Sequence, residues 1–318
     1  MHSPNGKARP ASPLLLSCDW GTSSFRLRLV NRRTSRIEAE HATEDGAKPI
    51  ASATTSVAAR HRGFREVLQR GLDSLGVADR TDIPLVISGM ACSTIGWQPL
   101  GYASLPARLS GRDFVVADRR IQGRQVRFVS GLRAACDVMR GEECELTGLF
   151  ASPSRQALAM DCLVVMPGTH SKHVRVRRGR ITDFCTHPTG ELFEILSKHS
   201  TFGGKLGRTF SARSFRAGIE AVQRSGMGPA LFRTRARTVL GYMPAEQSAD
   251  FLSGALIGAE IASLPRDIPI VLAAAPTLAR RYALAVQLLR PQGLLIRIAP
   301  AEVAHAVVRG HLQLASGL

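Results

Sequence analysis

Short apolar runs separated by polar turns mark the beginning of the chain. Residues 14–18 and 25–30 are mostly apolar and of strand length, and the segment between them contains Gly21 and small hydroxyl residues. This pattern predicts two antiparallel strands joined by a tight turn. Residues 37–42 are typical of a third strand. Apolar residues then recur at helical spacing over 57–75, which predicts a helix.

The same order of elements begins again near the middle of the chain. Residues 163–166 form an apolar run that leads into a glycine turn, and two further strands are expected at 173–176 and 181–185. Strands alternate with helices in both halves, so an α/β protein is predicted, and the antiparallel opening of each half favours mixed sheets. The other predicted strands are 85–88, 114–117, 126–129, 268–274 and 294–298, and the other predicted helices are 142–150, 191–199, 211–225, 229–240, 245–264, 277–289 and 302–315.

A stretch containing Ser and Pro at 151–154 separates the two halves. Such a stretch is typical of a loop between domains. We therefore predict a disordered polar tail over residues 1–13, a first domain over 14–152 and a second domain over 153–318.

Composition sets the broad class of the protein. Of the 318 residues, 44% are hydrophobic, which is normal for a globular protein. The sequence shows no signal peptide and no apolar run near the roughly 20 residues of a membrane span, so a cytoplasmic protein with no membrane partner is expected. The six cysteines have no CxxC spacing that would indicate a zinc site. The net charge of +17 either attracts anions or reflects arginines spread over the surface. Nucleic acid is not an expected partner, because the sequence shows no nucleic-acid-binding motif.

The first predicted turn carries residues suited to phosphate chemistry. It contains Asp19, Gly21, Thr22 and Ser23. Backbone N–H groups of a glycine turn can hold a phosphate, and an acid at the end of a strand can hold Mg²⁺ through water. Asp and Gly in a hairpin turn can also serve backbone conformation alone.

A second turn of this kind follows Met166. Met166 occupies the position that corresponds to Asp19 in the first turn, so the second turn has no acid there. It offers Gly168, Thr169, His170 and Lys172. Lys172 could neutralise phosphate charge or bind a substrate carboxylate, and it could equally be a solvated strand lysine; His170 could orient a substrate. Two such turns favour an ATP-dependent phosphotransferase built by duplication, since the chain has neither a P-loop nor the protein-kinase motifs.

Two further segments carry candidate substrate and catalytic residues. In one, Arg140 precedes Glu142 and Glu143 at a predicted helix start. Either acid could accept the proton of a substrate hydroxyl, although acids also favour the first helical turn for electrostatic reasons. Arg140 could bind a carboxylate. The other segment is a loop after a buried strand, and its candidates are Gly89, Met90 and Trp97.

Short motifs in chain order resemble the 2-dehydro-3-deoxygalactonokinase family. Each motif alone is weak, but the ordered set, which extends from about residue 14 to the C-terminus, is specific. The motifs are Asp-Trp-Gly-Thr-Ser at 19–23, Ser-Gly-Met at 88–90, Gly-Trp-Gln at 96–98, Met-Arg-Gly-Glu-Glu at 139–143, Met-Pro-Gly-Thr-His-Ser-Lys at 166–172, Thr-Gly-Glu-Leu at 189–192 and Phe-Leu-Ser-Gly-Ala-Leu-Ile-Gly-Ala-Glu at 251–260.

The resemblance implies two ribonuclease-H-like domains of the actin-like ATPase type, with a cleft between them. It implies transfer of the ATP γ-phosphate to the 6-hydroxyl of 2-dehydro-3-deoxy-D-galactonate, an intermediate of galactonate breakdown, with Mg²⁺ accompanying ATP. It also implies that Asp19 holds the metal through water and that the two turns face the phosphates from opposite domains. The base would be Glu143 or Glu142, of which the resemblance favours Glu143.

The chain departs from this superfamily after its late strand. Where a glycine-bearing turn usually lets the backbone approach adenosine, residues 273–276 are Ala-Ala-Ala-Pro. Alanine adds a Cβ, and Pro276 removes an N–H donor. Pro276 can still begin a helix whose N-terminus faces the nucleotide, so Ala274 and Thr277 are the expected nucleotide contacts here.

Three other functions are compatible with the sequence. One is a kinase of the same fold for another sugar or sugar acid. Another is a catalytically silent sugar-acid sensor, which the altered turn suggests. The third is a nucleic-acid-binding protein, which only the charge suggests. A homodimer is also compatible with the sequence, which does not determine the oligomeric state.

Overall fold

The computed structural model describes residues 12–201 and 209–318. The tail predicted over residues 1–13 therefore lies almost entirely outside the described residues. The chain divides into two compact units. The first unit contains the residues up to Gln156 together with His305–Leu318, and the second unit contains Ala157–Ala304.

The first unit is built on a mixed six-stranded sheet with the order β3-β2-β1-β4-β8-β7. β1 pairs antiparallel with β2 and parallel with β4, and β4 is parallel to β8. The strands of this sheet are β1 (Leu14–Trp20), β2 (Phe25–Asn31), β3 (Ile37–Thr43), β4 (Leu85–Gly89), β7 (Val116–Ile121) and β8 (Arg124–Val129). The remaining short strands of the unit are β5 (Ala103–Ser104), β6 (Ala107–Arg108), β9 (Leu132–Arg133) and β10 (Val138–Met139).

The second unit repeats this topology. Its central strand β11 pairs antiparallel with β12 and parallel with β14, and β13 and β15 follow on the two sides. In both sheets the first four strands in chain order therefore lie in the order third, second, first, fourth, and the next strand along is parallel to the fourth. This confirms the predicted mixed sheets and gives structural support to duplication. The strands are β11 (Asp161–Met166), β12 (Ser171–Arg177), β13 (Arg180–His187), β14 (Ile270–Leu272) and β15 (Leu295–Arg297).

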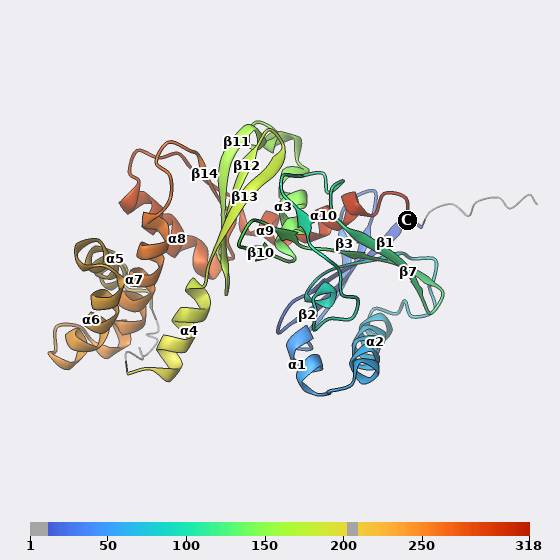
Figure 1. The fold of residues 1–318 in the computed structure, drawn as a ribbon, viewed down its shortest axis with the longest axis horizontal. Helices are drawn as coiled ribbons and strands as arrows, with labels where there is room; N and C mark the ends of the chain where they lie inside the picture. The colour runs from blue at the N-terminus through green and yellow to red at the C-terminus, as the bar shows by residue number, and fades with distance from the viewer. Residues whose placement is uncertain (1–11, 202–208) are drawn as a thin grey trace, which may run out of the picture. The chain divides into compact units, whose positions relative to one another are not determined.

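Helices cover both faces of the first sheet (Figure 1). Because side chains alternate along β1, Leu16 and Cys18 face the apolar core beneath α2, whereas Ser17 faces α10. The α3 and α10 helices pack together on that second face. The helices of the unit are α1 (Ala47–Ser52), α2 (Val57–Ser74), α3 (Glu142–Phe150) and α10 (Ala306–Leu314), with 3₁₀ turns η1 (Met90–Cys92) and η2 (Pro153–Arg155).

In the second unit, α5, α7 and α8 share an apolar core with the sheet. Glycines let α5 and α7 approach closely: a Cβ on Gly218 would stand 2.1 Å from the Phe251 carbonyl oxygen, and one on Gly254 would stand 2.0 Å from that of Phe215. The helices are α4 (Thr189–His199), α5 (Ala212–Ser225), α6 (Met227–Val239), α7 (Ser248–Ala262), α8 (Pro276–Leu289) and α9 (Pro300–Ala304), with 3₁₀ turns η3 (Leu158–Met160) and η4 (Ala245–Gln247).

The end of the chain differs from the prediction. The sequence predicts one helix over 302–315 within a second domain of 153–318, whereas α9 and α10 are separate helices and residues 305–318 belong to the first unit. The physical reason is a close helix contact, because a Cβ on Gly310 would stand 2.0 Å from the Cys144 carbonyl oxygen of α3. The strand predicted over 114–117 also begins later, as β7.

The two predicted turns are held in the same way in their own units. After β3, the Ala47 N–H donates to the Gly21 carbonyl at 3.0 Å, and after β13 the Glu191 N–H donates to the Thr169 carbonyl at 3.0 Å. Each turn is thus fixed by the start of the helix that follows the third strand. The glycines that permit this approach are Gly46 and Gly190, where an added Cβ would stand 2.3 Å from a carbonyl oxygen of the turn in both cases.

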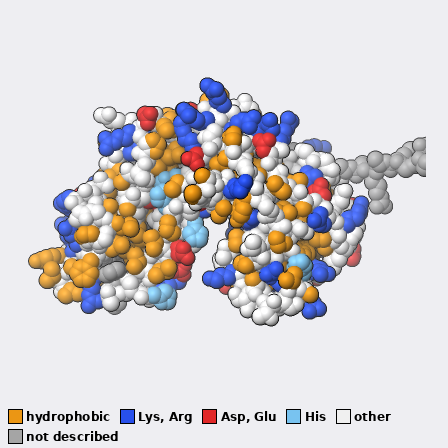
Figure 2. Space-filling view, viewed as in Figure 1, with side chains coloured by type: hydrophobic (Ala, Val, Ile, Leu, Met, Phe, Trp, Pro, Cys, Tyr) orange, Lys and Arg blue, Asp and Glu red, His pale blue; other side chains and the backbone are white. Residues whose placement is uncertain are grey.

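No helix within the described ranges is both long enough and apolar enough to cross a membrane. Lysine and arginine side chains occur on the visible face of both units, interspersed with uncharged and hydrophobic side chains (Figure 2). This distribution favours the explanation of the net charge as arginines spread over the surface.

Candidate functional site

Asp19 lies where two parallel strands of the first unit end. It is half-buried near the end of β1, in register with Arg26 of β2 and Ser88 of β4. This edge of an α/β sheet is where ligands usually bind. Burial raises the pKa of Asp19, and the charges of Arg28 and Arg26 oppose that rise.

The loop after β4 lies against the start of α3. Gly89 has φ +83° and Gly141 has φ +111°, a backbone region that favours glycine. A Cβ on Gly89 would stand 2.5 Å from the Trp20 carbonyl oxygen, and one on Gly141 would stand 3.6 Å from the Gly89 Cα. The structure therefore brings together the ends of β1 and β4 and the start of α3.

Exposure separates the two candidate bases. Glu143 is fully buried: Oε2 accepts a hydrogen bond from the Gly141 N–H at 2.7 Å, and Oε1 accepts one from the Cys144 thiol at 3.5 Å. Burial, followed by the charge of Glu142, raises the pKa of Glu143 to about 8. Glu142 is half-buried, and its Oε2 accepts from the Arg140 N–H at 3.0 Å. Of the pair, Glu142 is the one whose surface a substrate can reach.

A third acid of α3, Glu145, belongs to the same group, and the sequence-based candidates do not include it. Burial, and then the charges of Glu142, Asp19 and Glu143, raise the pKa of Glu145 to about 8. The carboxyl group of Glu145 is therefore close enough to Asp19 to interact with it. The signal in the sequence is the spacing, since Glu145 lies one helical turn after Glu142.

The Arg140 guanidinium has hydrogen-bond donors that are not used within the described residues. Its guanidinium carbon lies 4.3 Å from the centre of the Tyr102 ring, and Nη2 donates to the Leu100 carbonyl at 3.2 Å. The Nε and Nη1 atoms are buried, and no hydrogen-bond partner for them exists among the described residues. Buried donors without partners are costly, so these atoms suit a ligand with acceptor oxygens, such as a carboxylate.

Trp97 and Met90, both predicted to contact substrate, pack on the core. Trp97 is 7% exposed. Its ring stacks on Phe64 at 6.1 Å between centroids and meets Phe128 edge-on at 5.7 Å. Met90 is half-buried against the same core. Aromatic packing explains the position of the Trp97 ring without a ligand. Gly89, by contrast, lies beside the start of α3.

The second turn is open in its own unit. Thr169 and His170 are exposed, and His170 Nε2 hydrogen-bonds Glu191 Oε2 at 2.9 Å. No described atom lies within 4 Å of a Cβ added to Gly168, so a ligand can approach the backbone there. Lys172 is buried in β12, which is not the environment of a solvated strand lysine.

A cavity of about 150 Å³ adjoins the second turn. Its walls come from the turn, from the start of α4 and from α7 and α8, and they are largely apolar. Such a cavity suits a flat, weakly polar group attached to a phosphate. The lining residues are Gly168, Thr189, Gly190, Phe193, Ser253, Leu256, Ile257, Leu278, Arg281 and Tyr282.

The Ala-Ala-Ala-Pro segment ends β14 and begins α8. Pro276 occupies the first turn of α8, as the sequence predicts, and Ala275 precedes it without a side-chain cap. Ala274 is buried in the apolar core, whereas Thr277 is exposed. Of the two predicted nucleotide contacts, Thr277 is therefore the one whose side chain is accessible.

Four hydrogen bonds converge on Glu260 of α7, a residue that the sequence-based candidates do not include. Ser171 Oγ donates to Oε1 at 2.7 Å and His173 Nε2 lies 2.8 Å from it, while Thr189 Oγ1 and the Tyr282 hydroxyl donate to Oε2 at 2.5 and 2.7 Å. Burial opposes ionisation, but the His173 hydrogen bond and charge lower the pKa of Glu260 overall. Ser171 follows the second turn and Tyr282 lines the cavity, so Glu260 fixes the turn to the cavity wall.

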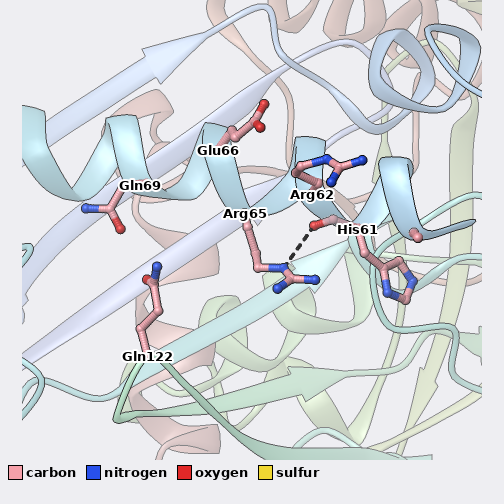
Figure 3. A pocket seen from close by; sticks show the side chains of 7 residues that line it. His61, Arg62, Arg65, Glu66, Gln69 and Gln122 are labelled. Atoms are coloured by element: carbon pink, nitrogen blue, oxygen red, sulfur yellow. Dashed lines mark hydrogen bonds between the residues drawn. The ribbon is translucent and has the colours of Figure 1, made fainter.

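A larger hollow of about 510 Å³ lies between α2 and the turn that joins β7 and β8 (Figure 3). Arg65 and Gln122 point into this space, and Arg65 Nε donates to the His61 carbonyl at 3.3 Å. None of the predicted site residues lines this hollow. Its size alone therefore does not mark it as the active site.

A magnesium site at Asp19 is compatible with the first unit. Among the described residues, no three His, Cys, Asp or Glu side chains are arranged to hold a metal ion together. Mg²⁺ that keeps most of its waters needs only one or two carboxylates and the substrate phosphates. The half-buried carboxylate of Asp19 at the sheet edge fits this requirement.

Comparison with known proteins assigns the family. The model of the 2-keto-3-deoxy-galactonokinase family matches residues 19–312. The chain belongs to this family. It is therefore a carbohydrate kinase, as the sequence motifs predict.

Three relatives agree with this assignment. The 2-dehydro-3-deoxygalactonokinase of Escherichia coli (strain K12) is 40% identical over 215 residues, 64% of this chain and 70% of the relative. A Rhizobium meliloti (strain 1021) protein, named as a probable 2-dehydro-3-deoxygalactonokinase, is 37% identical over 260 residues, 77% of this chain and 78% of the relative. The crystal structure of a Sinorhizobium meliloti protein assigned as a 2-dehydro-3-deoxygalactonokinase is 32% identical, covers 96% of this chain and 100% of its own, and has a TM-score of 0.76.

Proposed function

We propose that the protein transfers the γ-phosphate of ATP to the 6-hydroxyl of 2-dehydro-3-deoxy-D-galactonate. The product is 2-dehydro-3-deoxy-6-phospho-D-galactonate. The names of the Escherichia coli and Rhizobium meliloti relatives support this substrate.

The observation that carries the substrate class is the guanidinium of Arg140, with two buried donors unpaired beside the acids of α3. The carboxylate of the sugar acid binds these donors, and the 6-hydroxyl faces Glu142. As the hydroxyl oxygen attacks phosphorus, the new O–P bond forms, the bond to the ADP oxygen breaks, and Glu142 takes the hydroxyl proton. The resemblance favours Glu143 as this base, but the complete burial of Glu143 supports Glu142.

The nucleotide binds at the second unit, with its phosphates at the Gly168 turn. The cavity beside Gly168 receives the adenosine, and the open backbone of that turn supplies N–H groups to the phosphates. The turn of Gly21, Thr22 and Ser23 in the first unit likewise offers N–H groups to a phosphate. Asp19 would hold Mg²⁺ through water, and the bound ion would neutralise phosphate charge. The support is the shared topology of the units and the similar way in which a following helix start fixes each turn.

A coupled ADP-release assay with MgATP and 2-dehydro-3-deoxygalactonate tests this function. We expect turnover by the wild type, and we expect Arg140→Gln to raise the KM for the sugar acid about 100-fold because a charged pair is lost. Arg133→Gln, an exposed arginine of β9, is the matched control and should leave the KM unchanged.

Other outcomes of this assay point elsewhere. Turnover with a different sugar alone would assign another substrate to the same fold. Thermal stabilisation by the sugar acid without ADP release would indicate a sensor.

A further inference from the structure

A buried histidine of the C-terminal helix connects the two central strands of the first sheet. His311 of α10 is fully buried, with Ser17 Oγ of β1 2.8 Å from its Nδ1 and Ser88 Oγ of β4 2.9 Å from its Nε2. Both serines are buried as well. Ser17 precedes Asp19 by two residues, and Ser88 is the register partner of Asp19. His311 therefore spans the strands at the position of the candidate metal ligand.

Ser88 continues this connection to the start of α3. Its hydroxyl hydrogen-bonds the Cys144 thiol, which in turn donates to Glu143 Oε1 at 3.5 Å. The backbones of the two helices also meet here, since a Cβ on Gly310 would stand 2.0 Å from the Cys144 carbonyl oxygen. A continuous chain of buried polar groups thus runs from α10 to the acids of the site, and such chains are strong when every member is satisfied.

Burial fixes the charge state of the imidazole. Burial lowers the pKa of His311 to about 3, so the ring is neutral near neutral pH and has one donor and one acceptor nitrogen. The neutral ring therefore donates to one of the two serines and accepts from the other.

We propose that His311 is a positioning residue for phosphoryl transfer. It fixes the ends of β1 and β4 and the start of α3 relative to one another, so that Asp19, Gly89 and Glu142 keep the geometry the reaction needs. The proposal rests on the proposed function, because these are the groups assigned there. It also gives a functional reason for the return of residues 305–318 to the first unit.

Steady-state kinetics of His311→Leu and His311→Gln test the proposal. Leucine removes both hydrogen bonds, whereas the glutamine amide keeps a donor and an acceptor. We expect His311→Leu to lower kcat about 10-fold or more through misplacement of the acids, with the KM for ATP changed by less than about twofold. His311→Gln should recover part of kcat. Val308→Ala, fully buried on the same helix, is the matched control that removes packing alone and should lower Tm without lowering kcat.

Three results would overturn the proposal. One is wild-type kcat in His311→Leu. Another is a loss of kcat in Val308→Ala as large as that in His311→Leu, when the two variants lose the same amount of Tm. The third comes from ¹⁵N NMR of the histidine ring, which needs no activity: an imidazolium near pH 6 contradicts the neutral ring, on which Arg28 is the charged neighbour. If the wild type lacks turnover but the ring is neutral, the substrate assignment fails while the connection from α10 stands.

Discussion

Four carboxyl groups share a small region at the end of β1 and the start of α3, namely Asp19, Glu142, Glu143 and Glu145. Burial raises the pKa of both Glu143 and Glu145 to about 8, so each is largely protonated near neutral pH. Protonation of these two relieves the repulsion that four carboxylates would create. Asp19 and Glu142, both half-buried, are the two carboxyl groups assigned to the metal and to the substrate hydroxyl.

Asp19→Asn is expected to abolish most turnover and leave the fold intact. The amide keeps the shape of the side chain but loses the charge that places Mg²⁺, so kcat should fall about 100-fold or more in the ADP-release assay. Asp79→Asn, at an exposed site away from the acids, is the control and should retain wild-type kcat. Near-normal turnover of Asp19→Asn would show that Asp19 does not place the metal.

Glu143→Gln is expected to change how stability depends on pH. In wild type, the unfolded chain loses this proton near pH 4.5 and the folded protein holds it to about pH 8, so folding takes up a proton in that window. Stability therefore falls as pH rises through the window, and glutamine has no such dependence. Urea unfolding at a series of pH values should show the variant gaining stability relative to wild type up to about pH 8, and the difference should then level off.

The same variants separate the two candidate bases. Glu142→Gln should lower kcat by about 100-fold if Glu142 accepts the proton, and Glu143→Gln should lower it far less. A larger loss of kcat in Glu143→Gln than in Glu142→Gln would assign the base to Glu143.

At the scale of elements, the second turn depends on α7 through Glu260. This carboxylate accepts hydrogen bonds from β12, α4 and α8, which are the elements around the nucleotide cavity. We expect Glu260→Gln to raise the KM for ATP about 10-fold, because an amide cannot accept from all these donors and the turn loses its anchor. The KM for the sugar acid should stay near the wild-type value. Glu246→Gln, an exposed acid just before α7, is the control.

The local sequence pattern was sufficient to predict the strands and turns that carry the phosphate-binding candidates. β1, β2 and the turn with Asp19 follow from alternating apolar residues and a glycine, and both hairpins are confirmed. The assignment of α10 to the first unit depends instead on Gly310 contacting α3, a partner more than 160 residues away. Glu260 and His311 went unrecognised for the same reason, since a single acid or histidine in an apolar helix gives no local signal about its partners.

At the scale of the whole molecule, the two units have one topology and different chemistry. The first turn is next to Asp19 and the acids of α3, whereas the second turn has no acid and adjoins an apolar cavity. Duplication followed by divergence accounts for this difference, with metal and sugar acid assigned to the first unit and adenosine to the second. The central claim is that each turn, in its own unit, offers backbone N–H groups to nucleotide phosphate.

A crystal structure with a non-hydrolysable ATP analogue, Mg²⁺ and 2-dehydro-3-deoxygalactonate tests that claim most directly. We predict that backbone N–H groups of the Gly21 turn and of the Gly168 turn both bind nucleotide phosphate, with the sugar-acid carboxylate on Arg140. A nucleotide whose phosphates contact one turn alone, with the other turn facing no ligand, would contradict the account.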